Sequence, residues 1–434
     1  MNDNFRLGSW QDGYRLSDGC KIKHGFAFKG EFMNTQDDDS LPVVVNIVNF
    51  QYTGGFRFES TKVQRYVGAY PKEYELHPGD VLLVMTCQTP KGEILGVPGR
   101  IPIDGKRYLH NQRMGLAVVQ DREALDLGFL YYLFLSPQFN THLFKTATGA
   151  KILHTAPGRI EDYRFARPPM ETQRRIAAIL SSYDDLIENN TRRIKLLEEM
   201  AQMIYREWFV NFRFPGHENV RLVDSELGPI PEGWSVRNLF DVAHVTYGYP
   251  FKSKLFAEGG DGIPVIRIRD IKADSTNTMT TEAADSKYIV NNGDLLVGMD
   301  GDFHMGKWAG RKAYLNQRVV RFRPKLNLPS YFLFLALQAP IHHFDTTIVG
   351  TTVAHLSDRD LRSVNLLVPA DDVLEWSSAM FDPVFTLEIA LKLKNANLRA
   401  TRDLLLPKLI SGEIPVDNAR PGGADPSTLV KQNG

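Results

Sequence analysis

The sequence predicts an α+β protein in which two similar α/β domains are separated by two long antiparallel coiled-coil helices, related by a pseudo-two-fold axis. Three observations predict this fold: an internal repeat, a heptad tract after the first copy, and a looser tract after the second. The predicted segments are the first domain (1–167), the first long helix (168–213), a linker (214–235), the second domain (236–369), the second long helix (370–413) and a disordered tail (414–434).

Composition limits the class of protein. The chain has 434 residues, of which 43% are hydrophobic and 24% charged, as expected for a soluble protein of two or three domains. Lys+Arg 51 equals Asp+Glu 51, so any contact with nucleic acid needs local basic patches or a partner. Two cysteines, Cys20 and Cys87, are too few for a disulfide framework and favour a reducing, cytoplasmic setting. No apolar run is long enough to span a membrane.

The internal repeat consists of short segments that recur in the same order. The matches are Gly25 to Lys29 with Gly248 to Lys252, Leu41 to Val43 with Ile263 to Val265, Gly79 to Met85 with Gly293 to Met299, Asn111 to Arg113 with Asn316 to Arg318, Gly149 and His154 with Gly350 and His355, and Pro168 with Pro369. The distance between matched segments falls steadily along the chain, so the second copy has shorter loops. One architecture is therefore used twice.

Each copy is expected to contain strands, turns and a little helix. The β-branched runs Val43 to Val48 and Val265 to Ile268 predict strands. The Gly-Asp pairs that open the two longest matches predict turns before buried strands. Phe129 to Leu135 and Tyr331 to Leu337 predict short helices that fill the core.

The first long helix carries a heptad pattern. Apolar or small residues recur at spacings of four and three: Ile176, Leu180, Tyr183, Ile187, Asn190, Ile194, Leu197, Ala201, Ile204 and Trp208. Asn190 is the polar exception. It either fixes the register of a partner helix or occupies an exposed point of the seam.

The second helix, from about Asp371 to Ile410, has a looser seam. Its apolar members are Val384, Leu387, Leu391, Leu398, Leu405 and Leu409. Pro383 should kink the helix or restart it, and Gly412 should end it. Long helices need a partner for an apolar stripe, and the simplest partners are each other. The residues expected to pair the helices or bind a partner are Ile176, Leu180, Ile187, Ile194, Leu197, Ile204, Leu391, Leu398 and Leu405.

Catalytic motifs are missing from the sequence. It contains no phosphate-binding loop, no dinucleotide fingerprint and no zinc-ligand spacing. Arg167 to Met170 has only the two prolines of an adenine-methylating tetrapeptide, and Asp270-Ile271-Lys272 lacks the acidic partner of a nuclease site. His342 and His343 could bind a metal, but adjacent helical residues point apart, which favours a surface role. No catalytic or metal residue is predicted.

Three motifs resemble one known family. They are Glu171-x-Gln173-x-x-Ile176-Ala177 with Trp208-Phe209-x-x-Phe212, Ser225 to Trp234, and Leu405 to Ile414. With the repeat, they resemble the specificity subunit of type I restriction-modification systems over nearly the whole chain. The second helix departs from this pattern because it opens with Asp371-Asp372-Val373 and lacks the Gln-x-x-Ile of the first.

The resemblance implies a function without catalysis by this chain. Two target-recognition domains would each read half of a split double-stranded DNA site, and the helices would set the gap between the halves. Two modification subunits that bind S-adenosylmethionine would methylate adenines, and restriction subunits would use ATP and Mg²⁺ to translocate and cleave. This chain would carry no cofactor. The alternatives are a coiled-coil scaffold with two protein-binding domains, and an enzyme such as a nuclease with an unrecognised site.

Basic residues in the loops that differ between the copies are the candidates for DNA contact. They are Arg57, Lys62, Arg65, Lys91 and Arg107 in the first copy, and Arg267, Arg269, Lys307, Arg311 and Lys312 in the second. Asn111-Gln112-Arg113 and Asn316-Gln317-Arg318 could read bases. Their presence in both copies instead favours structural hydrogen bonding, because the two halves should read different sequences. His154 and His355 are expected to shape a shared turn near the phosphate backbone.

Overall fold

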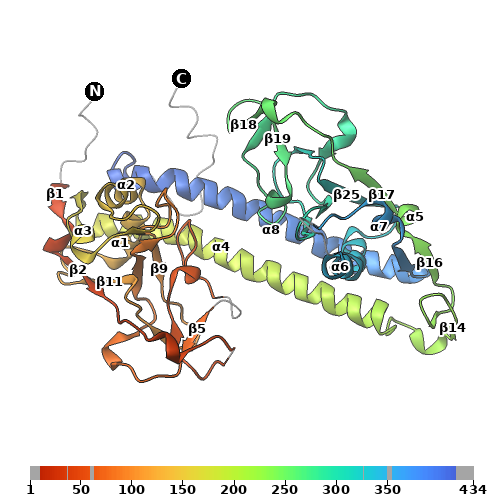
Figure 1. Cartoon of the computed structure of the whole chain (residues 1–434), viewed down its shortest axis with the longest axis horizontal. Helices are drawn as coiled ribbons and strands as arrows, with labels where there is room; N and C mark the ends of the chain where they lie inside the picture. The colour runs from red at the N-terminus through yellow and green to blue at the C-terminus, as the bar shows by residue number, and fades with distance from the viewer. Residues whose placement is uncertain (1–9, 37, 59–62, 326, 349–353, 417–434) are drawn as a thin grey trace. The chain divides into compact units, whose positions relative to one another are not determined.

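The computed structural model describes residues 10–36, 38–58, 63–325, 327–348 and 354–416. The chain divides into two compact units. Unit 1 contains the residues up to Asp185 and those from Ala400 onward, and unit 2 contains Leu186–Arg399. Two long helices, α4 (Met170–Tyr205) and α8 (Asp371–Ser411), each contribute residues to both units (Figure 1).

Unit 1 is built on three main sheets. A two-stranded sheet pairs β1 (Gln11–Arg15) with β13 (Arg164–Arg167). The four-stranded sheet has the order β2 (Cys20–His24), β11 (Met114–Val119), β7 (Val81–Val84), β9 (Pro98–Arg100). The five-stranded sheet has the order β3 (Met33–Asn34), β5 (Gln64–Tyr66), β4 (Val43–Val44), β10 (Tyr108–Leu109), β6 (Glu75–Leu76). A small sheet pairs β8 (Thr86–Cys87) with β12 (Leu153–His154).

Unit 2 repeats these three sheets with the same strand order. Its two-stranded sheet pairs β16 (Ser235–Asn238) with β26 (Asn365–Val368). Its four-stranded sheet runs β17 (Ala243–Tyr247), β25 (Val319–Pro324), β22 (Leu295–Gly298), β23 (Met305–Lys307). Its five-stranded sheet runs β18 (Phe256–Glu258), β20 (Thr278–Thr280), β19 (Ile263–Ile266), β24 (Ala313–Leu315), β21 (Ile289–Val290). The internal repeat predicted from sequence is confirmed.

Short helices accompany the sheets (Figure 1). The α-helices are α1 (Leu127–Phe134), α2 (Pro137–Thr146) and α3 (Pro157–Glu161) in unit 1, and α5 (Leu239–Val242), α6 (Ser330–Thr347) and α7 (Asp358–Arg362) in unit 2. The 3-10 helices are Leu16–Asp18, Gly30–Phe32, Ile47–Asn49, Lys72–Tyr74, His217–Asn219, Ser253–Leu255, Ile268–Asp270 and Ser286–Tyr288. The predicted core helices are confirmed, since six residues of α1 from Phe129 to Phe134 are buried and α6 buries Tyr331 to Leu333; α6, at 18 residues, is longer than the short helix predicted there.

The strand predicted over Val43 to Val48 is wrong beyond Val44. The Asn46 side chain accepts a hydrogen bond from the Val48 N–H, and the Asn46 N–H donates to the Asn49 side chain. These two bonds cap the 3-10 helix Ile47–Asn49 and turn the chain out of the sheet. The equivalent turn of unit 2 begins at Arg267, whose N–H donates to Asp270.

The predicted seam of α4 agrees with its burial. Ile176, Leu180 and Ala201 are fully buried, and Ile194, Leu197 and Ile204 are half-buried. A five-residue π-helical turn, Arg206–Val210, follows α4, and Gly412 ends α8 with a φ of 75°. That glycine conformation closes the helix as predicted.

The seam of α8 contains more polar residues than the sequence pattern suggested. Leu387 was expected in it but is 38% exposed, and its neighbour Glu388 is fully buried. The buried and half-buried positions with alternating spacings of four and three are Ser377, Phe381, Val384, Glu388, Leu391, Asn395, Leu398, Arg402, Leu405 and Leu409. Leu391 and Leu405 are buried, and Leu398 is half-buried.

Pro383 does not restart α8, because one unbroken helix runs through it from Asp371 to Ser411. Both Pro383 and Ala379, one turn earlier, are exposed. A proline removes the hydrogen bond to the carbonyl four residues before it. Here water can satisfy that carbonyl, so the helix continues through the proline.

The two long helices meet through polar contacts within each unit. In unit 2, the Asn190 side-chain amide donates to the Asn395 side-chain oxygen at 2.9 Å, and Asn395 donates to the Ile187 carbonyl at 3.2 Å. Asn190 is buried, so the alternative of an exposed seam point is excluded. In unit 1, Arg402 of α8 binds Asp184 of α4.

The segment predicted as a linker, 214–235, is folded. Its strands β14 (Leu222–Val223) and β15 (Ile230–Pro231) pair, and Phe214, Ile230 and Trp234 belong to the core of unit 2. At the end of the chain, Ile414 and Val416 pack on the core of unit 1, whereas the rest of the predicted tail lies outside the described residues. In the part of the chain that is described, no helix is long and apolar enough to cross a bilayer.

Candidate nucleic-acid interface

One parallel strand pair organises the candidate residues in each unit. In unit 1, β4 lies parallel to β10, and in unit 2, β19 lies parallel to β24. The backbone bonds from Val43 to Arg107 and from Val45 to Leu109 fix the register in unit 1. Strands that run in the same direction have a common amino end and a common carboxyl end. Most of the described candidates for DNA contact lie at the amino end or at the carboxyl end of this strand pair.

Two of the predicted DNA contacts are wrong because the side chains are buried and already neutralised. Arg65 is fully buried, and its guanidinium donates to Asp39 at 2.9 Å and to the Leu41 carbonyl at 3.4 Å. Lys307 is 4% exposed, and its Nζ lies 2.8 Å from Glu388. A buried cation with an internal carboxylate partner cannot reach a phosphate or a base edge.

Lys307 is the centre of a buried charge cluster in unit 2. Its ammonium also donates to the Tyr331 hydroxyl at 3.2 Å and lies 3.4 Å from Glu198. Burial raises the pKa of the Glu388 carboxyl, but Lys307 and Lys392 outweigh it and hold that pKa below its usual value. The pKa of Glu198 is raised, mainly by burial. The cluster joins β23 to α4 and α8 and is structural.

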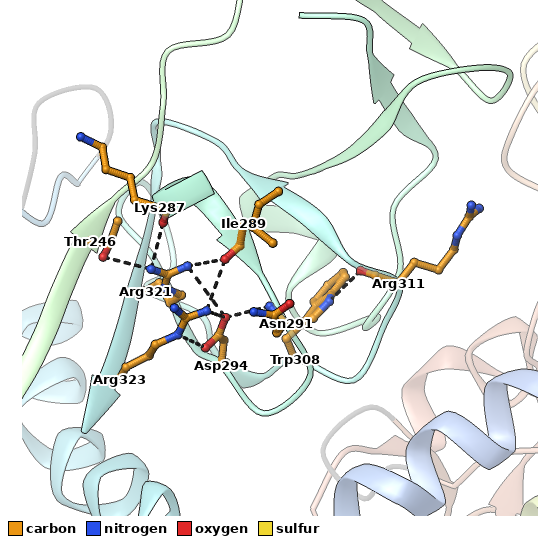
Figure 2. Close-up of polar contacts among 9 residues, drawn as sticks. All are labelled: Thr246, Lys287, Ile289, Asn291, Asp294, Trp308, Arg311, Arg321 and Arg323. Carbon is orange, nitrogen blue, oxygen red and sulfur yellow. Dashed lines mark hydrogen bonds and ion pairs between the residues drawn. The ribbon is translucent and has the colours of Figure 1, made fainter. Parts of the chain in front are cut away.

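A second buried network, which sequence reasoning missed, holds the sheets of unit 2 together. Asp294 accepts from Arg323 at 2.6 and 2.7 Å, and Arg321 donates to the carbonyls of Lys287 and Ile289 (Figure 2). The bond to Asp294 raises the pKa of Arg323, and burial lowers that of Arg321. Arg321 is buried, whereas Arg323 is half-exposed and is held against the buried Asp294. Alternating polar residues in β25 were the only sequence signal for them.

The exposed candidates at the amino end are Arg107, Arg311 and Lys312, which directly precede β10 and β24. Arg107 donates to the Ser40 carbonyl at 2.6 Å. The Arg311 carbonyl accepts from the buried Trp308 indole at 3.0 Å, which anchors the turn. Figure 2 shows the Arg311 side chain leading away from the Asp294 network.

The candidates at the carboxyl end are Arg57, Arg267 and Arg269, beside the 3-10 helices that follow β4 and β19. Arg57 is exposed and its Nε donates to the Val48 carbonyl at 2.9 Å. Arg267 is half-buried over the Phe256 ring, and Arg269 is exposed. Two candidates remain.

Lys91 and Lys62 are those two. Lys91 is exposed in the loop between β8 and β9, away from the strand pair. Lys62 lies outside the described residues, as does Gly350 of the repeat.

The repeated asparagines are structural. Asn111 forms a bridge with Phe26, and Asn316 forms the same bridge with Tyr249. A Cβ atom on Gly25 would lie 2.2 Å from the Asn111 carbonyl oxygen, and the matching distance from Gly248 to Asn316 is 1.9 Å. Only glycine allows this approach. The close approach to this backbone oxygen therefore explains why the glycine recurs.

The residues after each asparagine face solvent. Gln112, Arg113 and their unit 2 equivalents Gln317 and Arg318 are all exposed. They come directly after the turns that leave β10 and β24, at the carboxyl end. His110, which links β10 to this turn, is buried, and burial lowers its pKa to about 4. In unit 1, the motif thus follows a buried histidine and exposes its Gln-Arg pair to solvent.

Metal-binding clusters are absent from the described residues: no three His, Cys, Asp or Glu side chains there are placed so that they could hold a metal ion. His343 is exposed, and His342 lines a cavity of about 330 Å³ with His304 and Asp345. Cys20 and Cys87 are free and buried, and burial raises the pKa of Cys20 to about 12.

The chain was compared with known proteins. The family model for the type I restriction modification DNA specificity domain matches residues 9–199 and 231–391. The MjaIX specificity subunit of Methanocaldococcus jannaschii is 24% identical over 342 residues, which are 76% of this chain and 79% of that protein. The EcoBI specificity subunit of Escherichia coli is 36% identical over 143 residues, 32% of this chain and 30% of that protein.

A solved structure shares the fold. The S subunit of a type I restriction-modification system from M. genitalium has a TM-score of 0.59 and 13% identity, with 94% of this chain and 97% of that chain covered. The family model matches twice, once over most of unit 1 and once over most of unit 2, in agreement with the repeated strand order. The chain belongs to the family of type I restriction-modification DNA specificity subunits.

Proposed function

We propose that each unit reads one half of a bipartite double-stranded DNA site, and that this chain determines the DNA sites at which catalytic partner subunits act. The observation that carries the proposal is the same order of strands in the sheets of both units. A scaffold used twice in one chain presents loops at equivalent places. Two such readers recognise two half-sites with an unread gap between them.

Differences at equivalent positions support separate half-sites. Arg107 and Lys312 both stand four residues before the repeated asparagine. At the other end, Arg57 reaches the Val48 carbonyl, and the residue equivalent to Val48 in unit 2 is Arg269. The backbone is shared while the exposed side chains differ. Such differences let one scaffold read two base sequences.

The chemistry is assigned to other chains. Two modification subunits bind S-adenosylmethionine and methylate adenines, and restriction subunits use ATP and Mg²⁺. This chain is non-catalytic, binds no cofactor and works in the cytoplasm. This assignment of the chemistry to partner subunits rests on family membership. Metal-dependent cleavage of DNA by the purified chain would count against it.

The long helices are proposed to form an antiparallel coiled coil that sets the gap. Along α4, the contact residues are Asp184, then Asn190, then Glu198, and those opposite on α8 are Arg402, then Asn395, then Glu388 by way of Lys307. The partner number falls as the α4 number rises, as antiparallel helices require. The heptad spacing of both seams supports the coiled coil.

Sequencing of methylated DNA tests the function. The chain is produced with its modification subunits, and the sites that the complex methylates are mapped. We expect one motif made of two specified halves around an unspecified gap. Arg269→Ala and Arg311→Ala should weaken binding to this site, with Lys254→Ala as an exposed control. A coiled-coil scaffold that only binds proteins would leave DNA binding unchanged in both variants.

A further inference from the structure

The repeat allows an internal comparison of two readers. If the units read different bases, as proposed above, then an exposed side chain kept in both units serves a task that is common to both. Residues kept for packing must first be set aside. Gly25 and Gly248 are explained by the close backbone approach, the two repeated asparagines are half-buried in the same bridges, and Met85 and Met299 are buried.

Four exposed residues remain in each unit. They are Lys29, Gln112, Arg113 and His154 in unit 1, and Lys252, Gln317, Arg318 and His355 in unit 2. None of these eight side chains is needed to fill the core, since all are exposed. Arginine, histidine and glutamine all donate hydrogen bonds to anionic oxygen.

The same backbone bonds bring the arginine and the histidine together in both units. In unit 1, the Met85 N–H donates to the Arg113 carbonyl at 2.9 Å, and the Met85 carbonyl accepts from the residue after His154 at 2.9 Å. In unit 2, Met299 makes the equivalent bonds to Arg318 at 2.9 Å and to the residue after His355 at 2.8 Å. One buried methionine thus fixes two distant segments side by side.

In unit 2 the side chains are also in contact. The Arg318 Nη1 lies 3.5 Å from His355 Nδ1, and both side chains bind Asp300. In unit 1 the residue equivalent to Asp300 is Thr86, whose hydroxyl lies 3.2 Å from His154 Nδ1. Among the described residues, no carboxylate pairs with Arg113.

We propose that Arg113 with His154, and Arg318 with His355, form a repeated Arg–His pair that binds a phosphate of the DNA backbone. Gln112 and Gln317 stand beside the pairs and donate to the same strand. Phosphates carry no base information, so the same contact suits both half-sites. The pair also lies at the carboxyl end, where the Arg57 and Arg269 candidates are found.

The two pairs are not equal in charge. Asp300 binds both side chains of the unit 2 pair, at 3.3 Å from Arg318 and 2.6 Å from His355, whereas Thr86 carries no charge. A carboxylate beside the pair offsets the attraction for phosphate. Unit 1 therefore contributes more to backbone binding than unit 2.

Binding measurements on the full chain with its modification subunits test the proposal. Fluorescence anisotropy gives the Kd for a duplex with the mapped site and for one without it, at several salt concentrations. Arg113→Ala should weaken binding to both duplexes by the same factor, about 3- to 10-fold, and reduce the salt slope by about one. Arg122→Ala, an exposed arginine outside the repeat, is the matched control and should bind like the wild type.

Further variants distinguish the contributions of the two units to DNA binding. Arg318→Ala should weaken binding less than Arg113→Ala, and Asp300→Asn should tighten binding to both duplexes. Thermal unfolding checks that each variant is folded. The proposal is overturned if Arg113→Ala binds like Arg122→Ala, or if it changes the bases preferred at one position. A wild-type complex with no preference for any bipartite site would instead refute the proposed function.

Discussion

The burial of Lys307 predicts that this residue stabilises unit 2 and does not contact DNA. Lys307→Met removes the ammonium that lies 2.8 Å from Glu388, 3.2 Å from the Tyr331 hydroxyl and 3.4 Å from Glu198. The Glu388 side chain is fully buried, so the variant leaves a buried carboxylate with one partner fewer. Methionine keeps the length and the apolar contacts of the lysine stem.

The magnitude follows from the geometry of the cluster. Removing one member of a buried ion pair costs about 3–5 kcal/mol. Lys392 remains 3.4 Å from Glu388, so the lower end of that range, about 3 kcal/mol, is expected. The double variant Lys307→Met/Glu388→Leu should recover most of the loss, because no uncompensated charge stays buried.

Urea unfolding followed by tryptophan fluorescence measures the effect, since Trp308 is buried next to Lys307 in sequence. Lys312→Met is the matched control: Lys312 lies in the loop between β23 and β24 and is exposed, and its replacement should change stability by less than about 0.5 kcal/mol. Lys312→Met should instead weaken DNA binding. Equal stability of Lys307→Met and the wild type would refute the structural assignment of Lys307.

Three further predictions concern stability. Because the pKa of Glu388 is lowered in the folded protein, its carboxylate stabilises the fold fully above the unfolded pKa, near 4.5, and this stabilisation is lost as the pH falls through the folded pKa. The urea midpoint of the wild type should therefore fall between pH 7 and pH 3, and Glu388→Gln should make that fall smaller. Gly25→Ala should cost about 2 kcal/mol because its Cβ meets a backbone oxygen, whereas Gly30→Ala, with nothing within 4 Å, should be nearly neutral in the same assay. Asn190→Leu should lose about 1–3 kcal/mol by thermal unfolding, and the double variant with Asn395→Leu should regain it; a double variant as unstable as the single one would contradict the paired amides.

The recurrence of short segments in the same order was sufficient to predict the repeat, and the apolar pattern was sufficient to predict the first long helix. Residues such as Val81 to Val84 are apolar on both faces of the strand because both faces are buried. The α4 seam is almost wholly apolar, so its heptads can be counted directly. Each of these patterns is formed by residues that lie close together within one segment, so the pattern can be recognised from the sequence alone.

The second seam could not be predicted in this way. Glu388, Asn395 and Arg402 occupy successive heptad positions of α8 and are buried by distant partners such as Asp184 and Lys307. A count of apolar residues skips these positions and selects Leu387 instead. Polar seam residues become visible only when their partners are known.

The candidate DNA contacts show the same limit. Arg65 and Arg107 are both arginines in loops or short strands, and nothing in the sequence marks the first as buried and the second as exposed. Asp39, twenty-six residues before Arg65, decides the difference. The repeated Asn-Gln-Arg motif, by contrast, was visible in the sequence, but its division into a half-buried asparagine and exposed neighbours needed the structure.

The central claim is that two readers address two half-sites whose gap the long helices set. Seven residues, one heptad, inserted after Ile194 and seven after Leu391 preserve both seams and lengthen the proposed coiled coil by about 10 Å, roughly three base pairs. Sites methylated by the wild-type and the lengthened complexes are then mapped by sequencing. We predict the same two half-sites with a longer gap. An unchanged gap, or a motif without a gap, would contradict the account.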